Sequence, residues 1–260
     1  MKHLNFNKLS SLVARVLAVL LMSGLAMTAQ AQEDAEGNKG KSGTLMVGFK
    51  GGANLSEFIG GGLPFGYFAS GAGSAKMLGG QFLGLLRYQA NPWIAGDLEL
   101  GWSMGSAKFV GEAGRFGQGS GAYTYNTHAF QANLLANVRL PIITVYKPKF
   151  FIGPSLNYNF YVNERYTGIR AIGSEVIKID QSADATDFFE PVDFGAIVGL
   201  ELEFDLKFAV LLVDARYRHG FSNVNNATMG NAAPALRGKR SLESAGVYLN
   251  AGLAFPLGGK

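Results

Sequence analysis

The sequence contains no cysteine among its 260 residues. Disulfide bridges, thiolate nucleophiles and cysteine-based metal sites are therefore excluded. It has only three histidines, far apart in the sequence, so a histidine metal cluster is not indicated. Charged residues make up 16% of the chain, against roughly 25% in soluble domains. Beyond the N-terminal segment no apolar run reaches the ~18 residues of a transmembrane helix.

The N-terminal segment, residues 1–31, has the features of a secretory signal peptide. A basic start precedes an apolar core at residues 16–25, and Ala29-Gln30-Ala31 is a small-x-small cleavage site. A membrane anchor helix is disfavoured because the apolar run is short and ends at that site. No cysteine follows, which excludes a lipoprotein anchor. Residues 32–43 read as a flexible polar linker, so the folded domain is expected at residues 44–257.

The basic isoelectric point does not indicate nucleic-acid binding. The sequence pI is about 9.2, but three of the 23 basic residues lie in the leader, which has no acids. The remaining chain has 20 basic and 19 acidic residues. A nearly neutral chain offers no basic surface for a nucleic acid, and that function class is disfavoured.

Residues 193–221 show the clearest pattern, two strands joined by a tight polar turn at residues 205–207. In the first arm every second residue from Phe194 to Phe204 is apolar, while the residues between, apart from Ile197, are small or acidic. Side chains alternate across a strand, so each arm has one apolar and one polar face. Each arm is longer than an ordinary strand of about 5–6 residues and reaches the roughly 9–11 residues that a tilted membrane strand needs. A soluble barrel of the lipocalin type shows the same alternation with its apolar face inward, so this pattern alone leaves both open.

Alternation and turn residues predict eight strands in all. They are expected at residues 44–56, 75–88, 93–108, 122–140, 149–163, 193–204, at the second arm after the 205–207 turn, and at 241–257. The connections alternate between short turns and long polar or glycine-rich loops, among them residues 164–190. An up-and-down membrane barrel has this rhythm, with short turns on the periplasmic side and longer loops outside. The predicted fold class is an all-β, eight-stranded antiparallel up-and-down transmembrane β-barrel.

Aromatic residues gather at both ends of the predicted strands. Near the turns lie Tyr88, Trp93, Tyr146, Phe150, Phe204, Phe208 and Phe255. Near the loops lie Trp102, Tyr123, Tyr125, Tyr161, Tyr217 and Phe221. Two aromatic girdles that flank an apolar band are typical of a membrane barrel, whereas a soluble β-sandwich gains nothing from aromatics banded by depth.

The last predicted strand carries a candidate assembly signal. Asn250, Gly252, Phe255 and Leu257 are similar to the polar-x-Gly-x-x-aromatic-x-hydrophobic pattern with which outer-membrane barrels end. The chain departs from it by its Gly258-Gly259-Lys260 tail and by Pro256, which must lie at the strand's end because proline cannot donate to a ladder. We expect Phe255 to be read by the barrel-assembly machinery.

Five short segments resemble the PorT-like outer-membrane β-barrel domain family of Bacteroidetes-type bacteria. They are GFKGGANLS (48–56), LELGW (98–102), FIGP (151–154), DFGAIVG (193–199) and DARY (214–217). The resemblance covers most of residues 44–257 and implies an integral outer-membrane protein of Gram-negative cells. One branch of the family is tied to protein secretion and gliding, but the motifs identify the barrel family better than an individual function.

The polar faces of the predicted strands carry balanced charges. Five bases and five acids are expected to face the lumen: Lys50, Arg87, Arg139, Arg216 and Arg218, with Asp97, Glu99, Glu201, Glu203 and Asp214. An eight-stranded barrel has an interior just wide enough for side chains. Buried charges persist only when they are paired, so this set predicts a charge network that plugs the lumen. A narrow ion path is the alternative, because polar lumens also set selectivity.

Catalysis is not indicated. Some lipid-modifying barrels pair a histidine with a serine on one strand, but neither His128 nor His219 has a serine two residues away. The carboxylate pair Glu201 and Glu203 could suggest a glycosidase, but charged lumens make such pairs routinely. Residues 40–42, Gly-Lys-Ser, lack the first glycine of a phosphate loop. No catalytic, metal or cofactor residues are therefore assigned.

Two function classes remain open from the sequence. The first is a structural or interaction barrel that binds a partner or ligand through its extracellular loops. The second is a small porin or ion channel. The expected partners are outer-membrane lipid, the assembly machinery during insertion, and a protein at the loops or periplasmic turns.

Overall fold

The computed structural model describes residues 43–60, 73–112, 119–141, 147–172, 175–206, 208–224 and 242–257. The predicted leader, most of the linker and Tyr146 lie outside the described residues. The elements are β1 (Thr44–Gly60), β2 (Gly73–Gln89), β3 (Ile94–Glu112), β4 (Gly119–Arg139), β5 (Lys147–Ile172), β6 (Glu175–Asp184), the 3-10 helix η2 (Thr186–Phe188), β7 (Val192–Asp205), β8 (Val210–Gly220) and β9 (Leu242–Leu257).

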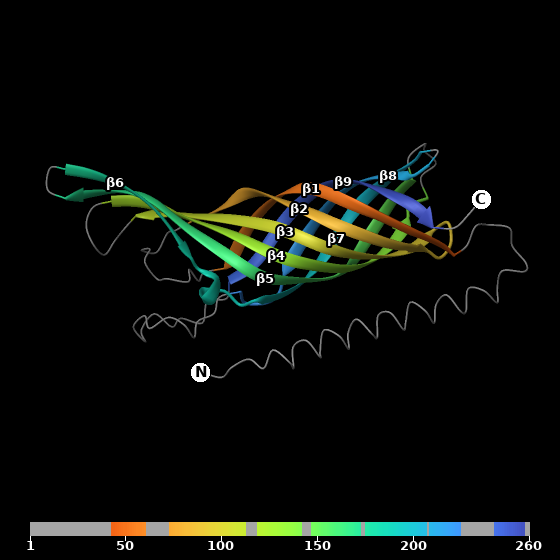
Figure 1. The fold of residues 1–260 in the computed structure, drawn as a ribbon, viewed down its shortest axis with the longest axis horizontal. Helices are drawn as coiled ribbons and strands as arrows, with labels where there is room; N and C mark the ends of the chain where they lie inside the picture. The colour runs from red at the N-terminus through yellow and green to blue at the C-terminus, as the bar shows by residue number, and fades with distance from the viewer. Residues whose placement is uncertain are drawn as a thin grey trace, which may run out of the picture.

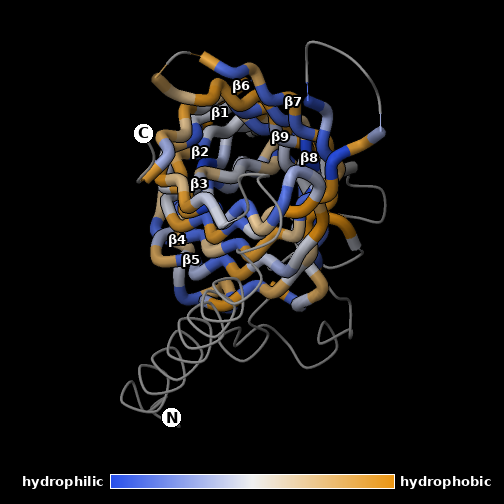
Figure 2. The backbone as a smooth tube through the Cα atoms, turned by 90° about the vertical axis from the view of Figure 1, so that its right-hand side faces the viewer, coloured by the Kyte–Doolittle hydropathy of each residue, from blue (hydrophilic) through white to orange (hydrophobic). Residues whose placement is uncertain are grey.

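Eight of these strands close into a ring. The sheet order is β4-β3-β2-β1-β9-β8-β7-β5-β6, and β4 also pairs with β5. All the pairings are antiparallel, including that of β1 with β9, which joins the two ends of the domain. Figure 2 shows the ring from one end, and Figure 1 shows it from the side. The predicted eight-stranded up-and-down barrel is therefore confirmed.

The barrel carries its apolar side chains outside and its charges inside. On β7, Leu200 is 55% exposed whereas its neighbour Glu201 is 1% exposed. Along each strand of the ring hydrophobic and hydrophilic residues alternate (Figure 2). A soluble barrel of the lipocalin type would have the opposite arrangement, because water favours the burial of apolar surface. The outward apolar band identifies the exterior as lipid-facing.

The short turns and both ends of the domain lie at one end of the barrel. Thr44 pairs with Gln89 of β2, and Leu257 pairs with Leu45 of β1, so the first and last strands share the turn end. Membrane barrels place short turns on the periplasmic side. The opposite end, where the longer strands project, is then extracellular. Among the ranges that the structure describes, no helix is long and apolar enough to cross a membrane.

The sequence missed a ninth strand. The residues predicted as one polar loop after the fifth strand instead extend β5 to Ile172 and form β6 and η2. Within the described part of the chain β6 pairs with β5 alone, from Asn163↔Asp184 to Ile172↔Glu175. Its residues are exposed on both faces. No buried face imposed an alternating pattern on this stretch, so periodicity could not reveal it.

Apolar side chains fill both ends of the barrel interior. At the loop end a buried cluster comprises Phe58, Ala107, Phe109, Tyr125, Val162, Ala185, Phe189, Val224 and Leu242. At the turn end a smaller cluster comprises Met46, Leu85, Leu212 and Ala254. Tyr125 was predicted in the outer girdle, but its side chain is 2% exposed and packs inside against Phe109 and Phe189. The segment around η2 supplies Phe189, so the missed element helps to close the loop end.

Candidate functional site: the lumen charge network

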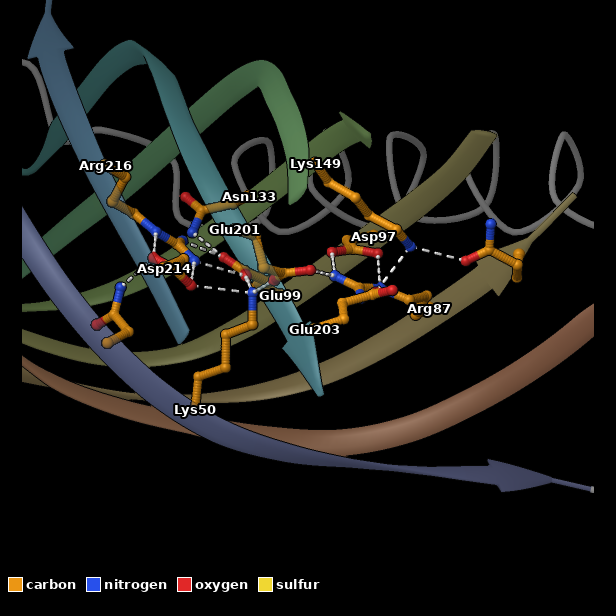
Figure 3. Close-up of polar contacts among 12 residues, drawn as sticks. Lys50, Arg87, Asp97, Glu99, Asn133, Lys149, Glu201, Glu203, Asp214 and Arg216 are labelled. Carbon is orange, nitrogen blue, oxygen red and sulfur yellow. Dashed lines mark hydrogen bonds and ion pairs between the residues drawn. The ribbon is translucent and has the colours of Figure 1, made fainter. Parts of the chain in front are cut away.

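The lumen between the two apolar clusters holds a continuous set of ion pairs. The side chains come from β1, β2, β3, β5, β7 and β8, all on the inward register of their strands. Figure 3 shows them meeting across the barrel interior. The members are Lys50, Arg87, Asp97, Glu99, Lys149, Glu201, Glu203, Asp214 and Arg216.

Lys50 lies at the centre of this network. Its Nζ is 2.7 Å from a carboxylate oxygen of Glu201, 3.1 Å from one of Glu99 and 3.1 Å from one of Asp214. All four side chains are at most 1% exposed. One ammonium group can donate three hydrogen bonds, and here it has three carboxylate neighbours from three different strands. Lys50 therefore ties β1 to β3, β7 and β8 across the lumen.

Arg216 holds two of the same carboxylates from the other side. Its Nη1 and Nη2 donate to Glu99 at 2.6 and 3.0 Å. Its Nε and Nη2 donate to Asp214 at 2.7 and 2.6 Å. The planar guanidinium matches such bidentate pairing, which fixes geometry as well as adding energy. The guanidinium carbon also lies 5.2 Å from the centroid of the Phe151 ring, a cation–π distance.

Arg87 organises the half of the network nearer the turns. It donates two hydrogen bonds to Asp97, at 2.7 and 2.6 Å, and its Nη2 is 2.7 Å from Glu201. It also contacts Glu203. Lys149 completes this half, with its Nζ 2.7 Å from Glu203. Glu201 thus joins the two halves, because it contacts both Lys50 and Arg87.

Amide side chains surround the charges and satisfy further oxygens. Asn133 donates to Glu99 at 3.0 Å, and Asn250 donates to Asp214 at 2.8 Å. Gln81 in turn donates to Asn250 at 2.6 Å. Because a buried charge is tolerated only when it is paired and hydrogen-bonded, this shell is part of what keeps the charges inside the barrel.

The structure brings eight of the ten predicted lumen residues into this network. Arg218 faces the lumen too, but it forms a separate pair with Asp193 at 2.9 Å and donates to Ser155 and Ser244. Arg139 lies at the turn end of β4, and its guanidinium carbon is 5.8 Å from the centroid of the Trp93 ring. Within the described ranges Arg139 forms no ion pair, so its expected place in the network is corrected.

Two charged residues of the lumen were not singled out from the sequence. Lys149, which lies opposite Arg139 on the neighbouring strand, pairs with Glu203, and Asp193 pairs with Arg218. The signal was present, because Lys149 shares the parity of the inward Ser155, and Asp193 shares that of Glu201 and Glu203. Their places at strand ends, where inward and outward are hardest to assign, concealed them.

The network has one more acid than base. Every base that its carboxylates contact is buried. Five carboxylates meet four cations, and each carboxylate contacts a base. Glu201 and Glu203 are thus held by Arg87 and its neighbours in a closed interior. A general acid needs a bound substrate within reach, and this arrangement provides structural bonding instead.

Above the charges lies a polar cavity of about 40 Å³. Its lining includes Ser103, Asn157, Asp193, Arg218 and Tyr248. In the described part of the protein, one amide or carboxylate oxygen of Asn157 and of Asp193 finds no hydrogen-bond partner. Such a volume holds a few water molecules, which would satisfy these atoms. The apolar cluster at the loop end covers it.

The four residues of the candidate assembly signal occupy different environments. Asn250 faces the lumen and bonds to Asp214, while Phe255 lies opposite Val47 on the outer face near the turn end. Leu257 ends the strand and is 48% exposed. Gly252 lies against β1: a Cβ there would come 2.9 Å from the Cα of Lys50. Gly252 therefore allows β1 and β9 to close beside the central lysine.

His128 and His219 lie on the outer surface near the loop end. His128 is surrounded by rings of Trp102, Phe160 and Tyr161, at centroid distances of 5.8, 6.4 and 5.7 Å. His219 lies 3.4 Å from a carboxylate oxygen of Glu243. Across the described residues, no group of three or more His, Asp or Glu side chains is arranged to hold a metal ion.

Comparison with known proteins places the chain among outer-membrane barrels. The family model described as an outer membrane protein beta-barrel domain matches residues 28–226, more than half of the chain. No curated protein matches the sequence.

Among solved structures, OprG from Pseudomonas aeruginosa is 11% identical with a TM-score of 0.37, covering 83% of this chain and 98% of its own. Neisserial surface protein A is 10% identical with a TM-score of 0.35, covering 81% and 97%. Ail of Yersinia pestis, solved with the heparin analogue sucrose octasulfate, is 13% identical with a TM-score of 0.32, covering 82% and 99%. These low scores add no functional argument.

Proposed function

The chain belongs to the outer membrane protein beta-barrel domain family, and from that premise we propose that it is a closed barrel whose extracellular end binds a partner. The protein is an integral outer-membrane barrel. Because its own side chains occupy the lumen, the barrel serves as an anchor in the membrane, and the projecting strands bind the partner.

The filled lumen carries this proposal. Nine interlocked charged side chains occupy the middle of the barrel, and all of them are at most 10% exposed. Apolar clusters lie above and below them. Moving one ion through this layer would require breaking several buried ion pairs at once. Breaking each pair is strongly disfavoured, because it leaves the other charge buried without a partner. A barrel built in this way supports a rigid anchor better than a pore.

The extracellular strands supply the surface for binding. β3, β4, β5 and β6 extend beyond the ring. β3 pairs with β4 up to Glu112↔Ser120, β4 with β5 up to Gly119↔Arg170, and β5 with β6 up to Ile172↔Glu175. Figure 1 shows β5 and β6 projecting along the long axis of the barrel. Loops and projecting segments on a rigid scaffold are where binding functions concentrate. The barrel therefore holds a regular sheet, not merely loops, above the membrane.

Planar-bilayer conductance tests the closed lumen. We expect the purified barrel to show small or no conductance, and a variant that removes the central cation, Lys50→Ala, to show more or to fail to fold. A conservative lipid-facing variant, Leu200→Ala, is the matched control and should leave the conductance unchanged. A large and steady conductance of the wild type would contradict a closed barrel.

A small porin or ion channel is the second candidate, favoured by one observation. Buried amide oxygens of Asn54, Gln81 and Gln131 have no partner within the described ranges. Gln81 lies opposite Ser103 and Gln131 opposite Asn157, two residues that line the polar cavity. Waters bound to these amide oxygens would form a polar path through part of the lumen. Conductance that depends on Glu99 or Arg216 would support this alternative.

Several finer assignments belong to the same proposal. We propose that residues 1–31 are removed as a signal peptide, that the barrel is PorT-like, and that it is not an enzyme. The assembly machinery would recognise the last strand through Phe255, and lipid would cover the outer apolar band. Purification of the protein from cells under mild conditions, with identification of what accompanies it, tests whether a partner binds outside or at the periplasmic turns.

A further inference from the structure

The outer edge of β6 is a long strand edge that carries no strand in the described part of the chain. The strand has ten residues, all exposed except Ile179, which is half-buried. It contains no proline, and its charged residues are Glu175, Lys178, Asp180 and Asp184, of which only one is a lysine. Proteins usually blunt such edges with short strands, prolines or several lysines, because an open edge is a template for pairing with another chain. This edge, residues 175–184, is here called the β6 edge.

The register shows which backbone groups point outward. The Ala185 N–H donates to the carbonyl of Val162 at 2.9 Å, which continues the pairing of β5 with β6. In an antiparallel pair the residues alternate between those that bond to the partner strand and those that do not. The odd-numbered residues of β6 therefore bond to β5. The backbone N–H and C=O groups of Val176, Lys178, Asp180 and Ser182 face the open edge.

We propose that the β6 edge binds the β6 edge of a second copy of this chain as an antiparallel strand pair centred on Ile179. In this register Lys178 lies opposite Asp180 of the second copy, twice by symmetry, and Val176 lies opposite Ser182. In this register the even-numbered residues, whose backbone N–H and C=O groups face outward, form the pairs that bond through the backbone. Such a contact is isologous and self-complementary.

The charges select this register over its neighbours. Centring the pair on Lys178 would place two lysines opposite each other, and centring it on Asp180 would place two aspartates opposite each other. Opposite charges across an antiparallel pair stabilise it and like charges destabilise it. Centring on Ile179 also places the two isoleucine side chains together at the symmetry axis, in a pair that does not bond through the backbone, where side chains approach most closely.

The direction of β6 decides where the second copy lies. β5 and β6 run along the long axis of the barrel (Figure 1). Two barrels in one membrane point the same way, so their β6 strands cannot run antiparallel. Antiparallel pairing places the two barrels at opposite ends of the joined sheet, in two membranes that face each other. The inference deepens the proposed partner-binding role, on which it rests, and names the partner as the same protein on an apposed surface.

Aggregation of vesicles that carry the full chain tests the contact. We expect wild-type vesicles to aggregate in a protein-dependent manner. Ser182→Pro removes one outward N–H without touching the bonds to β5. The symmetric contact then loses two backbone hydrogen bonds, which should slow aggregation about tenfold or more. Ser182→Ala keeps that N–H and is the matched control, expected to aggregate like the wild type. Heat-dependent gel migration checks that each variant is folded.

A charge exchange tests the register itself. Vesicles with Lys178→Glu should stay dispersed, because two acids then lie opposite each other, and vesicles with Asp180→Lys should stay dispersed because two bases do. A mixture of the two vesicle types should aggregate again, since each acid now meets a base. A variant that merely damaged β6, for example by loss of the Arg165–Asp180 ion pair, could not be restored by mixing.

Each other result overturns the inference. Dispersed wild-type vesicles would exclude a second copy of the chain as the partner of the β6 edge. An extended segment of a different protein would then be the partner to seek. Aggregation that Ser182→Pro and Lys178→Glu leave unchanged would place the contact elsewhere on the surface. Mixing without recovery would exclude the Ile179-centred register. A dispersed wild type with a closed lumen would refute this inference alone, whereas a large conductance would refute the proposed function.

Discussion

Lys50 and Glu201 meet inside the barrel with 2.7 Å between the ammonium nitrogen and a carboxylate oxygen, although 151 residues separate them in the sequence. Lys50 lies on β1 and Glu201 on β7, which do not pair with each other in the sheet. Their contact therefore crosses the lumen. It shows that the interior is held together by ion pairs between strands that share no backbone hydrogen bonds.

Loss of one lumen charge should cost more stability than loss of a lipid-facing side chain. Glu201→Ala removes one carboxylate partner from both Lys50 and Arg87. Arg216→Ala removes the guanidinium partner of both Glu99 and Asp214. Breaking a buried pair in this way costs about 3–5 kcal/mol. Leu200→Ala is the control, because lipid can fill the space outside, and it should cost less. Denaturant refolding in lipid measures the free energy of unfolding of all three variants. Equal losses would count against a stabilising role of the lumen charge network.

Gly252 should be intolerant of any side chain. A Cβ at this position would come 2.9 Å from the Cα of Lys50 and meet the backbone of Phe49. Gly252→Ala and Gly252→Asp should therefore reduce the amount of folded barrel. Gly96→Ala is the matched control, since a Cβ there meets nothing within 4 Å. The yield of folded protein in cells measures the effect, and equal yields from Gly252→Ala and Gly96→Ala would refute it.

Phe255→Ala should impair assembly more than a comparable change in a loop. Phe255 lies on the outer face of β9 near the turn end, opposite Val47 of β1. At that depth an aromatic ring anchors the barrel at the membrane interface. Phe221→Ala, at the loop end, serves for comparison. Fractionation combined with heated and unheated gel migration measures insertion, and wild-type levels of the folded Phe255→Ala form would exclude a special role for this residue.

Glu164 should make the loop end less stable as the pH rises. Burial raises the pKa of this carboxyl, and the hydrogen bond with Tyr125 opposes the shift only in part. A carboxyl with a raised pKa binds its proton more tightly in the folded state, so its ionisation lowers stability above the ordinary value near 4.5. Glu164→Gln should remove this pH-dependent loss of stability. Refolding followed between about pH 4 and pH 7 measures it, and an unchanged pH slope in the variant would contradict the assignment.

The order of the residues is enough to predict the barrel and the direction of its two faces. Alternation fixed which residues of β7 and β8 share a side, because a strand has a period of two and a one-residue slip would place Glu201 in lipid. The apolar band between aromatic residues then decided that the outer face meets a membrane. Glycine at position 252 and proline at 256 were also readable as features of a closing strand.

Which charges meet, and what projects from the barrel, became visible in the folded structure alone. The sheet order places β5 next to β7, so Lys149 lies opposite Glu201 and reaches Glu203, while Arg139, its partner on β4, is one strand further away. Alternation gives a side chain its face but not its height or its partner across the lumen. β6 is the second case: it is exposed on both faces, so nothing in its sequence had to alternate, and its strand form depends on pairing with β5.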